Sequence, residues 1–206
     1  MAERHEEYAV IAGHFGFAAA VKARAPGVPL WALMLACVWM DVLFVPLFAA
    51  GIETIVPLPG TQGGYGEGII HADYTHSLAG ALLIAVTFGL VAAIWWRGSV
   101  ALVLGAVVFS HWALDLPMHH ADMPLLPGNA GNFPLLGFGL WRWPWVSAVL
   151  EIGLVLLGTF LYARAASRAV EAAQPTGAPA QTRVRYVTAA LLLSGLVTLG
   201  LNWFGM

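Results

Sequence analysis

The sequence predicts an all-α, polytopic helical membrane protein with about six transmembrane helices in a single bundle. Apolar residues make up 60% of the 206 positions, charged residues only 10%, and the mean hydropathy is +0.78. These values lie well outside the usual range of a soluble domain. Apolar runs close to the length of a spanning helix also recur along the whole chain. We therefore expect one integral membrane domain over residues 1–206.

Six apolar segments come close to the twenty or so residues that cross the hydrocarbon core as a helix. Pro and Gly punctuate the chain between them, and two long Gly/Pro-rich loops are expected at 51–75 and 118–142. The first segment is the shortest, and His14 interrupts it. The expected spans are residues 7–24, 30–50, 76–96, 98–117, 143–163 and 184–204.

The basic residues predict how these spans are oriented. Seven of the nine Lys and Arg residues share one side of the predicted topology, and only Arg4 and Arg142 lie on the other. Because Lys and Arg accumulate on the cytoplasmic side, we expect both termini and both long loops to face outside, which is the periplasm or exterior for a bacterial inner-membrane protein. The N-terminus is net acidic, unlike a secretory signal, so we expect the first span to be retained.

Composition also excludes several functions. The single cysteine, Cys37, cannot build a disulfide framework or a cysteine-based zinc site. The formal net charge of −2 gives no reason to expect a nucleic-acid partner. The expected surroundings are membrane lipids, and the oligomeric state is left open.

Ionisable residues from five predicted spans fall in the outer half of the membrane. His14 and Asp41 lie roughly 10 Å and 13 Å below the outer ends of their spans, and Glu151 lies near the depth of His14. An Asp near the bilayer centre costs about 2.5–3.5 kcal/mol, and such residues usually mark a functional site. Several such groups at one depth therefore predict a site shared between helices.

The spacing of these residues favours a metal site. His111 and Asp115 stand four residues apart and so project from one helix face. His71 and His76 add imidazoles where the first long loop meets the third span, and Asp73 suits catalysis or an N-cap there. Imidazole with carboxylate favours zinc first, with iron or manganese as alternatives, in one or two sites. The candidate metal ligands are His14, Asp41, His71, His76, His111 and Asp115.

The second long loop carries a further group of polar residues. His119, His120 and Asp122 follow Pro117, so we expect them to be solvated at the start of this loop. His119 nevertheless continues the helix face of His111 and Asp115, which leaves open a role in the site.

Several short motifs resemble a family of small bacterial membrane proteins. They are His14-Phe-Gly-Phe-Ala, Asp41, Gly51-Ile-Glu53, Tyr74-Thr-His-Ser-Leu78, Ser110-His-Trp-Ala-Leu-Asp115, His119 with Asp122-Met-Pro-Leu, and Gly137-Phe-Gly-Leu-Trp141. Over residues 11–165 the chain resembles the YdjM-like membrane-bound metal-dependent hydrolases, or a closely related group. The resemblance implies the same six metal positions. Leu43 and Ala72 depart from it, standing where the family commonly has a second acid and an arginine.

The leading functional hypothesis is a metal-dependent hydrolase at the outer membrane–water boundary. Its metal would lower the pKa of a bound water and polarise the scissile bond, with Asp41, Asp73 or Glu151 as candidate general base. The depth of the site suits a phospholipid or another amphipathic substrate, although soluble substrates also fit. Two alternatives from other classes stay open: a metal-ion or proton-linked permease or channel, and a non-enzymatic membrane subunit with a structural metal.

Overall fold

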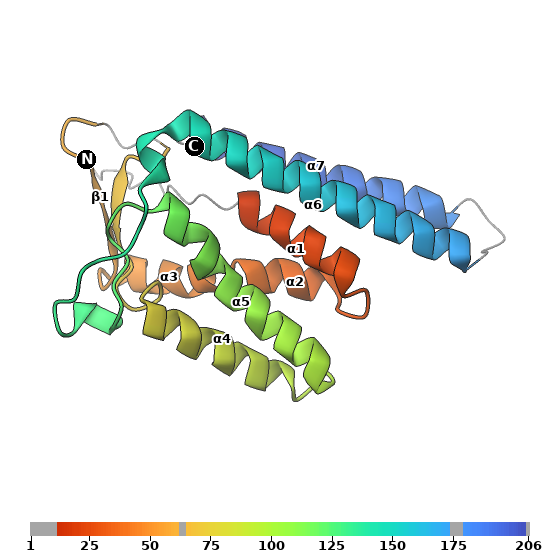
Figure 1. Cartoon of the computed structure of the whole chain (residues 1–206), viewed down its shortest axis with the longest axis horizontal. Helices are drawn as coiled ribbons and strands as arrows, with labels where there is room; N and C mark the ends of the chain where they lie inside the picture. The colour runs from red at the N-terminus through yellow and green to blue at the C-terminus, as the bar shows by residue number, and fades with distance from the viewer. Residues whose placement is uncertain (1–11, 62–64, 174–178, 205–206) are drawn as a thin grey trace.

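The computed structural model describes residues 12–61, 65–173 and 179–204, and these residues are mainly helical (Figure 1). Seven α-helices are joined by short turns, one β-hairpin and two 3-10 turns. The elements are α1 (Ala12–Arg24), α2 (Leu30–Cys37), α3 (Trp39–Ala49), β1 (Thr54–Pro57), β2 (Gly68–His71), α4 (Leu78–Ala92), α5 (Gly98–Met118), η1 (Pro127–Asn129), η2 (Leu140–Arg142), α6 (Pro144–Ala172) and α7 (Pro179–Phe204).

Three helices, α5, α6 and α7, are long and apolar enough to cross a membrane. The count rises to four if α2 and α3 form one span, bent by 44° at their junction. Helix α4 is apolar but has only 15 residues, and the described part of α1 has 13. Membrane insertion is consistent with this composition, and part of the expected first span at 7–24 lies outside the described residues.

The boundaries of several expected spans differ in the structure. The segment expected at 30–50 is broken at Val38, which has φ −118° and ψ 10°. Helix α4 begins at Leu78 and ends at Ala92, inside the expected span 76–96, because both flanks form turns. Helix α6 continues to Ala172, well beyond the expected end at 163. These differences arise where turn or cap geometry, rather than hydropathy, sets the helix end.

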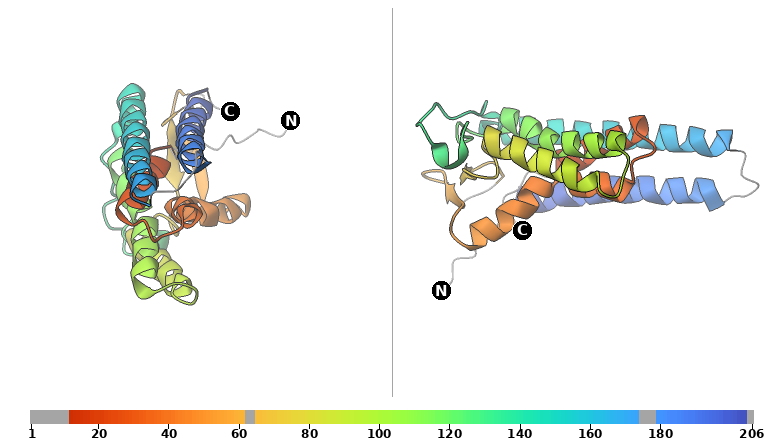
Figure 2. Two further views of the ribbon diagram at one scale, coloured as in Figure 1. Left: turned by 90° about the vertical axis from the view of Figure 1, so that its right-hand side faces the viewer. Right: turned by 90° about the horizontal axis from the view of Figure 1, so that it is seen from below.

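Small residues allow the helices to pack closely. Helix α1 crosses α6 at Gly16 and Gly158, where a Cβ atom on either glycine would overlap the backbone of the other helix. Gly89 and Gly105 also face each other between α4 and α5, where a Cβ on Gly105 would lie 3.0 Å from the Ala85 carbonyl oxygen. Close backbone approach through small residues is typical of helix packing in membranes. The packing places α1 between the α6–α7 pair and the group formed by α2 to α5 (Figures 1 and 2).

The two long loops lie together at one end of the helices (Figure 2). The loop expected at 51–75 contains the antiparallel hairpin β1–β2, with Thr54 opposite His71 and Pro57 opposite Gly68. The loop expected at 118–142 is fastened by a bridge between Met123 and Leu136. Ordered backbone pairing therefore covers this end of the helix bundle.

The start of α4 shows how that covering positions the site. Ser77 is its N-cap, and the Ser77 hydroxyl accepts a hydrogen bond of 3.1 Å from the Gly80 amide. The next two free amides of the helix donate to the Pro124 and Leu125 carbonyls of the second long loop. The cap role considered for Asp73 was therefore wrong, because the helix begins four residues later than that role requires.

Candidate metal centre

Five of the six candidate metal ligands come together near the loop-covered end of the bundle. They come from three helices and from the turn before α4, and four of the five are fully buried. Two groups of three side chains each present ligand atoms within 4.8 Å of one another and could hold a metal ion. These groups are His14 with His111 and Asp115, and Asp41 with His76 and His111.

Four ligand atoms form the most compact part of this cluster, which we call the tetrad: Asp41 Oδ1, His76 Nε2, His111 Nε2 and Asp115 Oδ2. His111 Nε2 lies 3.2 Å from the Asp41 oxygen and 3.1 Å from the Asp115 oxygen. His76 Nε2 lies 3.5 Å and 3.8 Å from the same oxygens and 3.3 Å from His111 Nε2. These five distances, 3.1–3.8 Å, lie close to the separation of about 3.3–3.6 Å between neighbouring ligands of a tetrahedral zinc.

The break between α2 and α3 determines which nitrogen of His111 faces the tetrad. With the helix interrupted at Val38, the Cys37 carbonyl is available, and it lies 2.7 Å from His111 Nδ1. A carbonyl oxygen can only accept, so His111 Nδ1 carries the proton and donates it. When the ring is neutral, it therefore presents an unprotonated Nε2 to the tetrad, the form that binds metals.

A chain of hydrogen bonds orients His76 in the same sense. The Thr75 hydroxyl donates to the Glu53 carboxylate, with Oγ1 to Oε2 at 2.9 Å, and lies 2.8 Å from His76 Nδ1. Since that hydroxyl has given its only proton to Glu53, it accepts the proton of His76 Nδ1. Glu53 is fully buried and also accepts from the amides of Tyr74 and Thr75, both at 2.8 Å. When neutral, His76 thus also presents an unprotonated Nε2.

Sequence reasoning gave Glu53 no role. It belonged to one of the family-like motifs, but it stands alone in a loop with no periodic pattern to indicate burial. Only the fold of β1 and the turn before α4 brings its carboxylate under Thr75 and His76.

The local polar balance of the cluster favours a cation. The two Nε2 atoms lie 3.3 Å apart beside two carboxylates, an arrangement that a shared positive charge, either a proton or a metal ion, stabilises. Within the described part of the chain, Asp41 Oδ2 and His14 Nδ1 are buried without a hydrogen-bond partner. Buried polar atoms of this kind require an explanation, and a bound ion or water supplies one.

His14 supports the tetrad from α1. Its Nε2 atom lies 3.1 Å from Asp115 Oδ1, the oxygen that does not face His111. Its ring also lies against that of His111, with centroids 4.0 Å apart. His14 therefore holds Asp115 in place, and it can also serve as a ligand in the group it forms with His111 and Asp115.

Glu151 lies on α6, outside both groups of ligands. Its carboxylate accepts hydrogen bonds from the Tyr65 hydroxyl and from the Gly13 amide, the latter at 3.2 Å. Tyr65 belongs to the loop region, where burial and the adjacent Glu151 carboxylate raise the pKa of its phenol well above the usual value. The side chain of Glu151 thus ties α6 to α1 and to the loop region.

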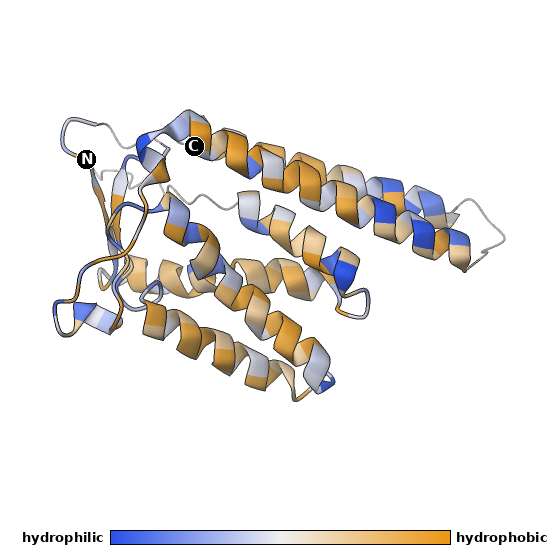
Figure 3. Ribbon diagram, viewed as in Figure 1, coloured by the Kyte–Doolittle hydropathy of each residue, from blue (hydrophilic) through white to orange (hydrophobic). Residues whose placement is uncertain are grey.

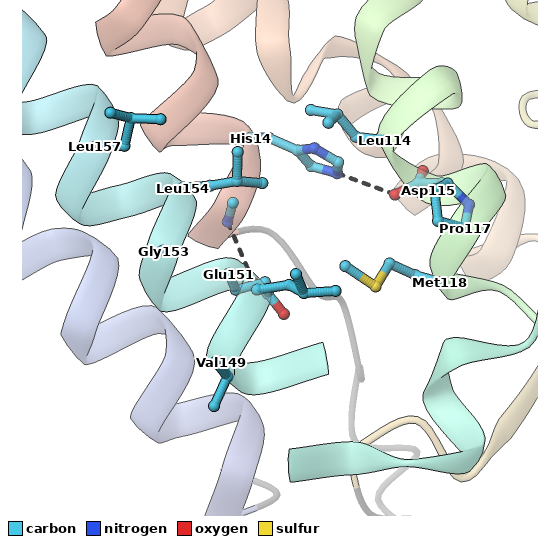
Figure 4. A pocket seen from close by; sticks show the side chains of 12 residues that line it. His14, Leu114, Asp115, Pro117, Met118, Val149, Glu151, Gly153, Leu154 and Leu157 are labelled. Carbon is cyan, nitrogen blue, oxygen red and sulfur yellow. Dashed lines mark hydrogen bonds and ion pairs between the residues drawn. The ribbon is translucent and has the colours of Figure 1, made fainter. Parts of the chain in front are cut away.

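A cavity of about 460 Å³ lies beside the cluster, between α1, α5 and α6. Figure 4 shows His14 and Asp115 along one part of its wall and Glu151 on another. Most of the remaining lining is apolar, as with Leu114 and Leu154. The candidate metal site therefore adjoins a space large enough for a small ligand.

The other two site candidates lie apart from the cluster. His71 ends strand β2 with its side chain exposed, and among the described residues it belongs to neither group of potential ligands. Asp73 is half-buried, belongs to neither group, and its carbonyl accepts from the Gly128 amide at 3.0 Å. Although both residues are close to His76 in sequence, they do not join it in the cluster, because β2 ends and the chain turns before α4 begins.

The polar residues after Pro117 are buried rather than solvated, contrary to expectation. His119 Nδ1 lies 2.9 Å from Asp122 Oδ1, and Asp122 Oδ2 accepts from the Ile70 amide at 2.9 Å. His120 Nε2 lies 2.9 Å from the Gly66 carbonyl. These bonds fasten the second long loop to the first, which keeps both loops over the cluster.

No protein-family model, no curated protein and no solved structure matches this chain.

Proposed function

We propose that this protein is a membrane-embedded, metal-dependent hydrolase that binds one divalent metal ion, zinc in the first instance, at the tetrad. One observation carries the proposal: His76 and His111 direct their Nε2 atoms toward the same point, 3.3 Å apart, between the carboxylates of Asp41 and Asp115. The hydrogen bonds at both Nδ1 atoms hold the two rings so that each Nε2 can bind a metal.

Three of the four tetrad residues would hold the ion, and the fourth would handle protons. Catalytic zinc sites commonly use three protein ligands and leave one position for water. His76, His111 and Asp115 have side chains only 2–8% exposed, whereas that of Asp41 is 21% exposed. Asp41 therefore suits the position nearest to water, where its carboxylate acts as general base better than the more distant Asp73 or Glu151.

The reaction is the addition of water to an ester. When bound, the metal lowers the pKa of water to about 7 and polarises the substrate oxygen. Asp41 removes a proton from the attacking water, the water oxygen bonds to the acyl or phosphoryl centre, and the ester bond breaks. Asp41 then returns the proton to the departing alcohol oxygen, so one water is consumed and one acid and one alcohol form.

The proposal includes six membrane crossings with the tetrad on the outer side of a bacterial inner membrane. In support, Figure 1 places the α1–α2 and α4–α5 connections, the end of α6 and the start of α7 at the end opposite the hairpin. Lys22 and Arg24 lie in the last turn of α1, and Arg97 lies in the connection before α5. The hydrophilic ends of α6 and α7 carry four more arginines (Figure 3). Their clustering fits the excess of basic residues on the cytoplasmic side. Membership of the YdjM-like hydrolases is proposed on the shared motifs.

Metal content tests the proposal. We expect detergent-purified wild-type protein to carry one transition metal per chain and to hydrolyse a phospholipid or a fluorogenic ester. His111→Gln should abolish both, while His71→Gln, which changes an exposed histidine outside the cluster, should abolish neither.

Three results would contradict the proposal. A wild-type protein free of metal would leave an ion-pair network, and full metal content in His111→Gln would place the ion elsewhere. Metal-dependent flux in proteoliposomes without any ester hydrolysis would favour a permease.

A further inference from the structure

We propose that the cavity between α1, α5 and α6 binds one hydrocarbon chain of a membrane lipid, with the polar end of that chain at His14 and Asp115. The inference rests on the proposed hydrolase function for its catalytic meaning, because it identifies the substrate as a lipid ester. Binding of the chain requires no catalysis, so the two proposals can fail separately.

The walls of the cavity suit a hydrocarbon chain. Leu114 and Met118 of α5 face Leu154 of α6 across it (Figure 4). Its volume of about 460 Å³ lies within the range of small-molecule sites. Burial of an aliphatic chain against such side chains is favourable in proportion to the apolar area covered. The occupant should therefore be apolar over most of its length.

The flank of the cavity on α6 faces the hydrocarbon of the membrane. Val149, Leu150 and Leu157 line it and are 60%, 43% and 55% exposed. Helix α6 is one of the candidate membrane spans, so exposed apolar side chains on it contact lipid rather than water. A polar occupant arriving by this route would lose its hydrogen bonds to water, whereas a lipid chain would not.

The polar residues of the cavity give the chain a direction. Glu151 already accepts hydrogen bonds from Tyr65 and Gly13 and is 1% exposed, so its carboxylate does not require a cationic ligand. His14 and Asp115 line the cavity and also contact the tetrad. An ester at this wall would lie next to the proposed metal site while its chain extends between α5 and α6.

Gly153 offers a way to block the cavity without disturbing the helices. It lines the cavity on α6, and a Cβ atom added there would meet no other atom within 4 Å. Gly200 on α7 is equally unobstructed but is not part of the lining. Gly153→Trp should fill the membrane-facing side of the cavity, and Gly200→Trp is its matched control. Gly153→Leu provides a smaller block if the Trp variant is produced poorly.

The experiment uses full-length protein in phospholipid vesicles that contain a phospholipid with a photoactivatable diazirine on one acyl chain, close to its ester. After illumination, the labelled residues are identified by peptide mass spectrometry. We expect label on Met118, which is only 8% exposed yet lines the cavity, in the wild type and in Gly200→Trp. Gly153→Trp should reduce the labelling of Met118 several-fold, while the labelling of exposed Leu83 on α4 is unchanged.

Two outcomes would overturn the inference. One is an unlabelled Met118 in the wild type, and the other is equal Met118 labelling in wild type and Gly153→Trp. Hydrolysis by a wild-type protein with no label on Met118 would refute lipid binding in the cavity and leave the proposed hydrolase function standing. Met118 labelling in a protein without bound metal or hydrolysis would refute the hydrolase function and leave lipid binding in the cavity standing.

Discussion

Two His/Asp pairs lie on either side of Pro117, and they have different environments. His111 and Asp115 belong to α5 and converge with Asp41 and His76, so that four ligand atoms meet. His119 and Asp122 follow the helix, and their hydrogen bonds connect the loops to each other. Both pairs are buried and combine the same two residue types. The difference lies in their neighbours. The first pair contacts a further imidazole and a further carboxylate, whereas the carboxylate of the second pair accepts a hydrogen bond from a backbone amide.

The largest effect on metal binding should come from neutralising the carboxylate of the first pair, and the same change in the second pair is the control. Asp115→Asn keeps the size of the side chain but removes the charge that both His14 and His111 contact. We expect it to lose bound metal and to reduce hydrolysis to background, as measured by elemental analysis and an ester assay. Asp122→Asn should keep one metal per chain. Equal metal loss in the two variants would erase the distinction between the pairs.

Removal of the metal should produce the next largest effect. A ligand present at 100 times its dissociation constant stabilises the folded state by about 2.7 kcal/mol. Chelator treatment should therefore lower the thermal unfolding temperature of the wild type and of Asp122→Asn, and re-addition of zinc should restore it. The unfolding temperature of Asp115→Asn should not respond. A response in that variant of the same size as in the wild type would show that the metal binds elsewhere.

A smaller effect should follow from releasing His76. Thr75→Val removes the hydroxyl between Glu53 and His76 Nδ1, so the imidazole loses its fixed orientation. Residues that orient a metal ligand typically contribute about 10–100-fold in metal affinity. A competition titration against a chromophoric chelator should show a loss of that size, with recovery in Thr75→Ser. Unchanged metal affinity in Thr75→Val would show that the hydrogen bonds from Glu53 through Thr75 to His76 do not support metal binding.

The smallest change in metal binding is expected from a substitution at the second pair, which should instead lower the stability of the folded protein. Asp122→Asn weakens the contacts to His119 and to the Ile70 amide, and loss of a buried hydrogen-bond partner costs about 1–3 kcal/mol. Thermal unfolding should detect this loss while zinc affinity remains within a few-fold of the wild type. A stability equal to that of the wild type would mean that the loops are held mainly by other contacts.

Sequence patterns predicted the helical class and the members of the cluster that share a helix or a depth. The four-residue spacing placed His111 and Asp115 on one face, and the cost of a buried carboxylate indicated Asp41. Hydropathy could not predict the break at Val38, because turn geometry interrupts a run that is apolar on both sides. The Cys37 carbonyl that orients His111 depends on that break.

Loop contacts account for most of what the sequence could not predict. His71 and His76 are five residues apart, yet one ends a strand and the other precedes a helix cap, so they do not share a site. Glu53 reaches Thr75 through a contact between distant residues that carries no periodic signal. The same holds for Asp122 and the Ile70 amide, whose pairing explains why this loop segment is buried.

X-ray absorption spectroscopy at the metal edge of purified wild-type protein tests the central claim most directly. Two imidazoles and carboxylate oxygen should surround zinc at about 2.0–2.2 Å, with no sulfur ligand. The imidazole scattering should fall in His111→Gln and persist in an Asp122→Asn sample. A spectrum without imidazole ligands, or one that changes only in Asp122→Asn, would contradict a metal held at the tetrad.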